Sequence, residues 1–306
     1  MFVLTWCAGI SEEIQIQIDE WLDLYTVWEF EEASVLFDGL VEEKNVPDEV
    51  WYYKATVEIG RGDIITAKND INTFLQLQPN HIEWKVTQAY IFNLLKENES
   101  ALKLLQDVLI EEPSNELAQT YIAMLHIQNA DYILAEPFLL NLIDEFPENP
   151  EYPYILGSMY SDRGFESDEQ EYTDKALSYL YTSYQKDKSN PNTTLYLWIS
   201  LIDADQFEDA AKVLAILIQN DPGNWLSRTH LWVSLSRLWR NNQAEVALNK
   251  ALELEPSSVL ASNELQKLGR KVEQIVYVTQ SARFMTELEK AGRGIENIWI
   301  TPMLDF

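Results

Sequence analysis

The chain has 306 residues and carries 50 acidic against 22 basic side chains, which gives a formal net charge of −28 at pH 7. Such an acidic surface repels phosphates, so nucleic acid is excluded as an expected partner. Because no run reaches the roughly 18 to 20 apolar residues of a membrane helix, we expect a soluble protein without an integral membrane segment.

The first residues, 1–13, form an apolar stretch that contains Cys7, the only cysteine. A lipoprotein-type signal is disfavoured, because no basic region precedes the apolar residues and Trp6 is bulky where cleavage sites require small side chains. We therefore expect residues 1–13 to pack as an apolar cap on the first repeat. A single cysteine allows no internal disulfide, which agrees with a reducing compartment, and we expect a cytoplasmic location.

A period of 34 residues runs through residues 48–149. In each period two alanines and a proline follow one another at intervals of twelve residues. Small side chains allow two helices to approach closely where their axes cross, and a proline ends the second helix. The recurring residues are Ala55, Ala67 and Pro79, then Ala89, Ala101 and Pro113, and finally Ala123, Ala135 and Pro147.

This spacing resembles the tetratricopeptide repeat (TPR). The resemblance implies an all-α fold, a right-handed α-solenoid of about seven TPR-like helical hairpins with a C-terminal capping helix and a short extra tail. The same frame extends backwards to Ala33 and forwards to Pro222 and Pro256, so the array covers residues 14–258. We expect its repeats at 14–47, 48–81, 82–115, 116–149, 150–190, 191–224 and 225–258.

Two features depart from the regular repeat. The fifth repeat is seven residues longer than the others, and its extra residues, 165–171, are mostly charged, so we expect them to lengthen the turn or the start of the second helix. Trp198 and Trp232 stand where earlier repeats have Ala or Gly. We expect these indoles to be buried by exchange with the smaller side chains of Ser183 and Ala251 on a facing helix.

Residues 259–306 follow the last repeat. Their first part, 259–268, has the apolar spacing of a capping helix. Two alternatives remain for residues 270–306: a further helix pair, or a small strand–helix–strand appendage. We favour helix for residues 271–291, because an isolated two-stranded element is only marginally stable.

The chain lacks the motifs of the common enzyme classes. It contains no dinucleotide, P-loop or hydrolase-elbow glycine motif, and no pair of ligands at zinc-site spacing. His81, His126 and His230 fall at unrelated positions of the repeat. We therefore expect no enzyme activity, no metal and no cofactor.

The TPR resemblance also implies a binding groove, which in such proteins is lined by the first helix of each repeat. The matching positions are mostly aromatic and aliphatic here, and Arg237 is their only cation, so the chain departs from the receptors that clamp a C-terminal carboxylate with basic residues. The candidate groove residues are Ile18, Leu22, Tyr25, Tyr52, Thr56, Ile59, Tyr90, Asn93, Met124, Ile127, Tyr154, Ser158, Leu195, Ile199, Ile202, Val233 and Arg237.

Together these features predict a non-enzymatic scaffold or adaptor that binds another protein through an apolar, basic-flanked peptide or helix. Acidic charge supports the basic flanks, because it steers basic partners to the surface, although it could equally serve to solvate an apolar-rich array. Two alternatives are a docking subunit of an enzyme or secretion complex whose activity lies in the C-terminal extension, and a self-associating assembly protein.

Overall fold

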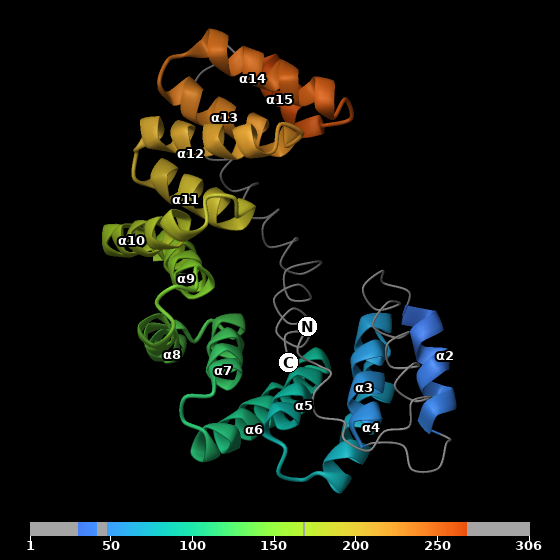
Figure 1. Cartoon of the computed structure of the whole chain (residues 1–306). Helices are drawn as coiled ribbons and strands as arrows, with labels where there is room; N and C mark the ends of the chain where they lie inside the picture. Colours follow the sequence, from blue (N-terminus) through green and yellow to red (C-terminus); the bar gives the residue numbers. More distant parts are fainter. Residues whose placement is uncertain (1–29, 42–47, 168, 268–306) are drawn as a thin grey trace. The chain divides into compact units, whose positions relative to one another are not determined.

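The computed structural model describes residues 30–41, 48–167 and 169–267, and every regular element in these ranges is an α-helix (Figure 1). The expected apolar cap and the C-terminal extension after residue 267 lie outside these ranges. The helices are α2 (Phe30–Val41), α3 (Glu49–Arg61), α4 (Ile64–Leu77), α5 (Ile82–Leu94), α6 (Asn98–Glu111), α7 (Glu116–Gln128), α8 (Tyr132–Glu145), α9 (Glu151–Ser167), α10 (Gln170–Lys186), α11 (Pro191–Asp203), α12 (Phe207–Asn220), α13 (Trp225–Arg237), α14 (Asn241–Leu254) and α15 (Val259–Lys267).

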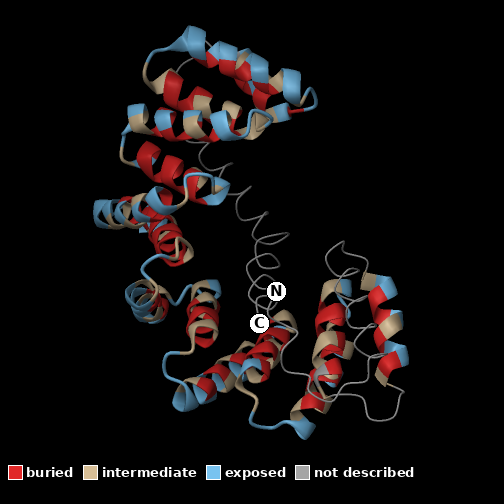
Figure 2. Ribbon diagram, in the orientation of Figure 1, coloured by how far each residue is buried: buried red, intermediate tan, exposed pale blue. Residues whose placement is uncertain are grey.

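The chain divides into two compact units, whose described residues fall within 30–138 and within 139–267. In the N-terminal unit each helix from α2 to α7 packs against the next one along the chain, and in the C-terminal unit the helices from α9 to α15 do the same. First helices of successive hairpins also touch, as α5 touches α7 and α9 touches α11. This nearest-neighbour packing makes the fold an all-α solenoid of helical hairpins. The first helix of a hairpin is more buried than the second, as α11 and α12 illustrate (Figure 2).

The small residues of the repeat lie where the two helices of a hairpin cross. Ala55 and Ala67 are fully buried in the α3–α4 hairpin, and Ala101 is fully buried in the next one. In the α9–α10 hairpin the small residue is Gly157, and a Cβ built on it would lie 2.7 Å from Cγ and 3.0 Å from the backbone nitrogen of Leu180. The helices approach so closely that this crossing requires glycine.

A left-handed residue closes the first helix of the regular hairpins. Its φ is 81° at Gly62, 62° at Lys96, 58° at Ala130, 56° at Asp205 and 60° at Trp239. In each case the next residue donates its backbone N–H to the carbonyl five residues earlier, which is the hydrogen bond of a Schellman cap. Only one of these five positions has the glycine that such a conformation favours.

The long hairpin differs from its expected form. Its helices α9 and α10 have 17 residues each, against 13 and 14 in α3 and α4. The extra residues therefore extend the end of α9 and the start of α10, so the expected lengthening of the second helix is confirmed and the alternative of a longer turn is wrong. Aromatic contacts support the added turns: the Tyr172 ring stacks on Tyr160 at 6.1 Å, and the Arg163 guanidinium lies 4.2 Å from the Tyr172 ring centre.

Substitution of Gly157 tests the close helix crossing. Gly157→Ala should lower the free energy of unfolding by about 1 to 3 kcal/mol, because its new methyl group overlaps Leu180. Gly39→Ala in α2 is the matched control, since nothing lies within 4 Å of a Cβ at that position. Chemical denaturation should show unchanged or higher stability for Gly39→Ala, and equal effects of the two substitutions would contradict the steric argument.

Substitution of Ala130 tests the left-handed turn. Ala130→Gly should raise the free energy of unfolding by about 1 kcal/mol, because glycine has no Cβ to strain this conformation. Asn129, the preceding residue, has φ −88° and is the control. Thermal melts should show a gain for Ala130→Gly and none for Asn129→Gly; a gain for both would point to a different cause.

Candidate functional site

Aromatic contacts join the first helices of successive hairpins in the N-terminal unit. Tyr52 of α3 stacks on Trp84 of α5, with ring centres 4.7 Å apart and planes inclined by 19°. Tyr90 of α5 faces Tyr121 of α7 at 6.2 Å. The first helices thus form a continuous wall, which we call the first-helix wall.

The same kind of wall occurs in the C-terminal unit, where polar pairs add to the aromatic contacts. Tyr154 of α9 meets Tyr196 of α11 edge to face at 6.0 Å. The indole nitrogen of Trp198 on α11 donates a hydrogen bond of 3.0 Å to the Ser234 hydroxyl on α13. Trp198 and Trp232 are both buried, in agreement with the expectation from sequence.

The predicted groove residues differ in how far a partner can reach them. Ile18, Leu22 and Tyr25 lie outside the described residues. The buried ones are Thr56, Ile59, Tyr90, Asn93, Tyr154, Ser158, Ile199, Ile202 and Val233, whereas Tyr52, Met124, Ile127, Leu195 and Arg237 are half-buried. Of the predicted groove residues that the structure describes, only the half-buried set is open to contact in this conformation.

Tyr52 and Arg237 are the polar members of this half-buried set. Desolvation raises the pKa of Tyr52 to about 12, although hydrogen bonding to Thr87 and Thr56 favours the ionised form. Its hydroxyl is therefore neutral at physiological pH. The Arg237 guanidinium lies over the Phe207 ring at 5.2 Å, so the cation already has an aromatic contact.

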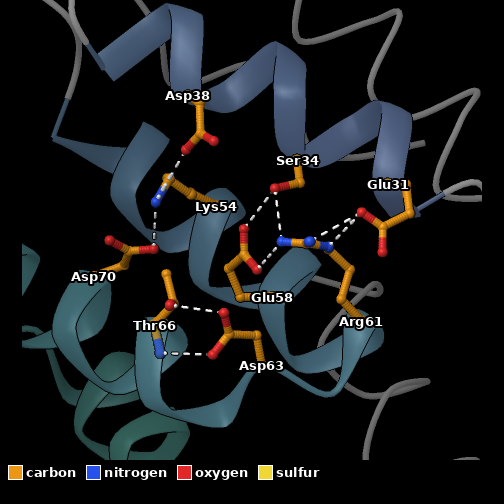
Figure 3. A network of polar contacts seen from close by, with 9 residues as sticks. All are labelled: Glu31, Ser34, Asp38, Lys54, Glu58, Arg61, Asp63, Thr66 and Asp70. Atoms are coloured by element: carbon orange, nitrogen blue, oxygen red, sulfur yellow. Dashed lines mark hydrogen bonds and ion pairs between the residues drawn. The ribbon is translucent and has the colours of Figure 1, made fainter.

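A buried ion pair holds α3 to α4 in the N-terminal unit (Figure 3). Lys54 of α3 lies 2.8 Å from the Asp70 carboxylate of α4 and 3.4 Å from the more exposed Asp38 of α2. Burial alone would lower the pKa of Lys54, but the hydrogen bond and charge of Asp70, together with Asp38, raise it. Lys54 thus stays protonated and paired.

A second polar cluster joins α2 to α3 beside the ion pair (Figure 3). The Ser34 hydroxyl donates to the buried Glu58 carboxylate at 2.7 Å, and Arg61 contacts the other oxygen of Glu58 at 2.6 Å. Arg61 also reaches Glu31 at 2.9 Å. These groups bind one another, so their arrangement is a structural joint between helices. This joint was not predicted from the sequence, although Lys54, Glu58 and Arg61 follow the spacing of one helix face.

His230 is the most strongly perturbed histidine. It is buried on α13, its ring stacks on Trp198 at 4.6 Å, and burial lowers its pKa to about 4. Across the described ranges, neither ring nitrogen has a hydrogen-bond partner. Its surroundings are those of a packed core residue.

No group of three or more His, Cys, Asp or Glu side chains in the described residues could hold a metal ion. In the same part of the chain, no helix combines the length and the apolar character needed to cross a bilayer.

Several solved structures share this fold. The C-terminal part of a TPR repeat-containing protein from Cytophaga hutchinsonii matches with a TM-score of 0.60 at 16% identity, over 81% of this chain and 98% of that one. PilF of Pseudomonas aeruginosa matches with 0.57 at 16% identity, over 72% and 97%. YrrB, described as a TPR protein with an unusual peptide-binding site, matches with 0.52 at 17% identity, over 64% and 97%.

At these identities the likeness establishes the fold. Neither the models of protein families nor the curated proteins give a match to the sequence.

The buried histidine predicts a pH dependence of stability. The His230 pKa is about 4 in the folded protein, against 6.5 as the ordinary value. Below about pH 6.5 the unfolded chain therefore binds a proton that the folded chain rejects, so stability falls towards pH 4. His230→Phe keeps the stacking on Trp198 and removes the titration. The free energy of unfolding of the variant minus that of wild type should be about 2 kcal/mol larger at pH 5 than at pH 7.

Denaturant titrations of both proteins at the two pH values measure this difference. The many carboxylates titrate alike in wild type and variant, so their contribution cancels. A stability difference that does not change between pH 7 and pH 5 would show that His230 accepts a proton in the folded protein.

Proposed function

The chain is a tetratricopeptide-repeat protein in its fold, and we propose that it is a non-enzymatic scaffold or adaptor that binds another protein. Its partner presents an apolar segment flanked by Lys or Arg, which lies along the first-helix wall of the N-terminal unit. One observation carries this proposal: half-buried apolar side chains remain on that wall, at Tyr52 of α3 and at Met124 and Ile127 of α7. Partly exposed aromatic and apolar side chains are common anchors of interfaces.

The acidic charge of the chain supports the proposal that the partner segment has basic flanks. The Glu83 carboxylate is exposed and interacts electrostatically with Tyr52. The chain as a whole carries 28 more negative than positive charges. Such a field attracts basic segments and raises their association rate. YrrB, which shares the fold, is described as having a peptide-binding site.

The burial of Tyr90 changes which residues can anchor the partner. Sequence spacing predicts a ladder of Tyr25, Tyr52, Tyr90 and Met124. Tyr90 is 1% exposed, so its truncation would leave a cavity and destabilise the fold. Of the described members of this ladder, Tyr52 and Met124 are therefore the ones that can anchor the partner.

Binding of a designed peptide tests the proposal. Its leucines are placed at helical spacing and lysines occupy the flanking positions, and its affinity is measured by fluorescence anisotropy. Tyr52→Ala and Met124→Ala should each weaken binding by about fivefold or more, because each removes an anchor. Ile65→Ala is the control, since Ile65 is equally apolar but lies exposed on the second helix α4.

Added salt should slow association more than it speeds release, because exposed charges are screened over about 10 Å at 0.1 M salt. Circular dichroism verifies that the variants stay folded. Equal affinity of wild type and the Tyr52→Ala/Met124→Ala double variant would refute the wall as the binding surface.

A further inference from the structure

An open groove of about 700 Å³ runs between α12, α13 and α14 in the C-terminal unit. Its floor is apolar, with Leu231 and Leu235 from α13 and Val246 from α14. Val246 is 68% exposed, although it lies beside the buried Ala247. The groove is lined by the second helices α12 and α14 together with the first helix α13, and it lies in the other unit from the first-helix wall of the N-terminal unit.

The charged residues that line this groove are mostly basic, whereas the chain as a whole is acidic. Four cations line the groove, and Glu208 is the one acidic residue among its lining residues. Acidic residues outnumber basic ones by more than two to one in the chain as a whole. The cations come from three helices and one turn: Lys212, Arg228, Arg240 and Lys250.

Three of these cations form ion pairs with half-exposed or exposed carboxylates, and these pairs are weak. Lys250 pairs with Glu253 within one helix turn, and both side chains are about half exposed or more. Lys212 pairs with Asp209 at 2.8 Å within one helix turn, and both side chains are largely solvated. Arg240 meets Glu208 at 3.0 Å across the groove, again with both side chains about half exposed. Such pairs contribute about 0 to 1 kcal/mol. A ligand carboxylate can therefore replace the protein's own carboxylates at little cost.

Arg228 has further capacity to bind an anion. Its Nη2 donates to the Pro222 carbonyl at 3.0 Å. Its Nε is buried and lacks a hydrogen-bond partner among the described residues. A buried donor without a partner is costly, so a small rotation of the half-buried Arg228 side chain that brings this N–H to a ligand carboxylate is favourable.

An exposed tryptophan stands at the end of the groove. Trp239 is 81% exposed and borders a smaller hollow of about 430 Å³, which shares Arg240, Asn242 and Gln243 with the groove. Its φ of 60° is the left-handed conformation in which the corresponding residue of α3 is Gly62. An exposed indole in this conformation does not stabilise the turn, whereas tryptophan is among the strongest interface anchors.

We propose that this groove binds an acidic amphipathic segment of a partner protein. The apolar side chains of that segment cover Leu231 and Val246, its carboxylates meet Arg228 and Lys250, and Trp239 anchors its end. This groove and the first-helix wall of the N-terminal unit are formed by different helices, and the two surfaces prefer partners of opposite charge. The array then has two docking surfaces of opposite preference.

Matched peptides test the charge preference. They share leucines at helical spacing and carry Glu, Gln or Lys at the flanking positions. The Glu peptide should bind about tenfold or more tightly than the Gln peptide, and Arg228→Gln/Lys250→Gln should remove most of this difference. Lys103→Gln/Lys188→Gln makes the same change in net charge at exposed positions on α6 and after α10, away from the groove, and should leave binding unchanged.

Trp239→Gly separates binding from folding. It should raise the melting temperature, because it relieves the left-handed strain, and weaken the Glu peptide by about fivefold or more. Equal affinity of this variant and wild type, or loss of binding in the Lys103→Gln/Lys188→Gln control, would overturn the proposal. Light scattering gives a further test. If the wild type self-associates and Arg228→Gln/Lys250→Gln abolishes this self-association, a second copy occupies the groove and the proposal is overturned.

Discussion

The close approach of two helices at a small side chain is the contact on which this structure depends. Ala55 and Ala67 are fully buried at one crossing, and at another Gly157 leaves no space for even a methyl group beside Leu180. Because the second helix lies so close, the first helix is enclosed on one side by its partner and on another by neighbouring first helices. Burial of the first helices, and with it the character of the wall that they form, follows from this constraint.

Those crossings have a sequence signature, so the hairpins could be predicted from a 34-residue period of alanines and prolines. The left-handed turns could not be, because Lys96, Ala130, Asp205 and Trp239 occupy a conformation for which glycine is the usual signal. The extension of the first helix in the long hairpin was missed for a related reason. The charges of the added residues suggested a longer turn or a longer second helix, but the aromatic and cationic contacts beside the added turns involve Tyr160 and Tyr172, which lie outside the added segment.

The proposed binding surfaces were less predictable than the fold, because exposure depends on what neighbouring helices cover. Tyr52 and Tyr90 are the same residue type on successive first helices, yet one is half-buried and the other fully buried. The cationic groove is harder still to read, since Lys212, Arg228 and Lys250 are far apart in sequence and meet only after three helices have packed. A residue list can name candidates, but packing decides which of them a partner can touch.

The polar joint between α2, α3 and α4 has a consequence for how such an array can change. Apolar hairpin faces are largely interchangeable, but Glu58 and Lys54 are buried groups that require partners at fixed places on the adjoining helices. A hairpin with an ordinary apolar face, inserted between α2 and α3, would take Ser34 from Glu58 and Asp38 from Lys54, whereas Glu58 would keep Arg61 and Lys54 would keep Asp70. The lost hydrogen bond to the buried Glu58 carboxylate costs about 1 to 3 kcal/mol. Lengthening of the array by duplication of a repeat is therefore less favourable at this joint than at apolar joints.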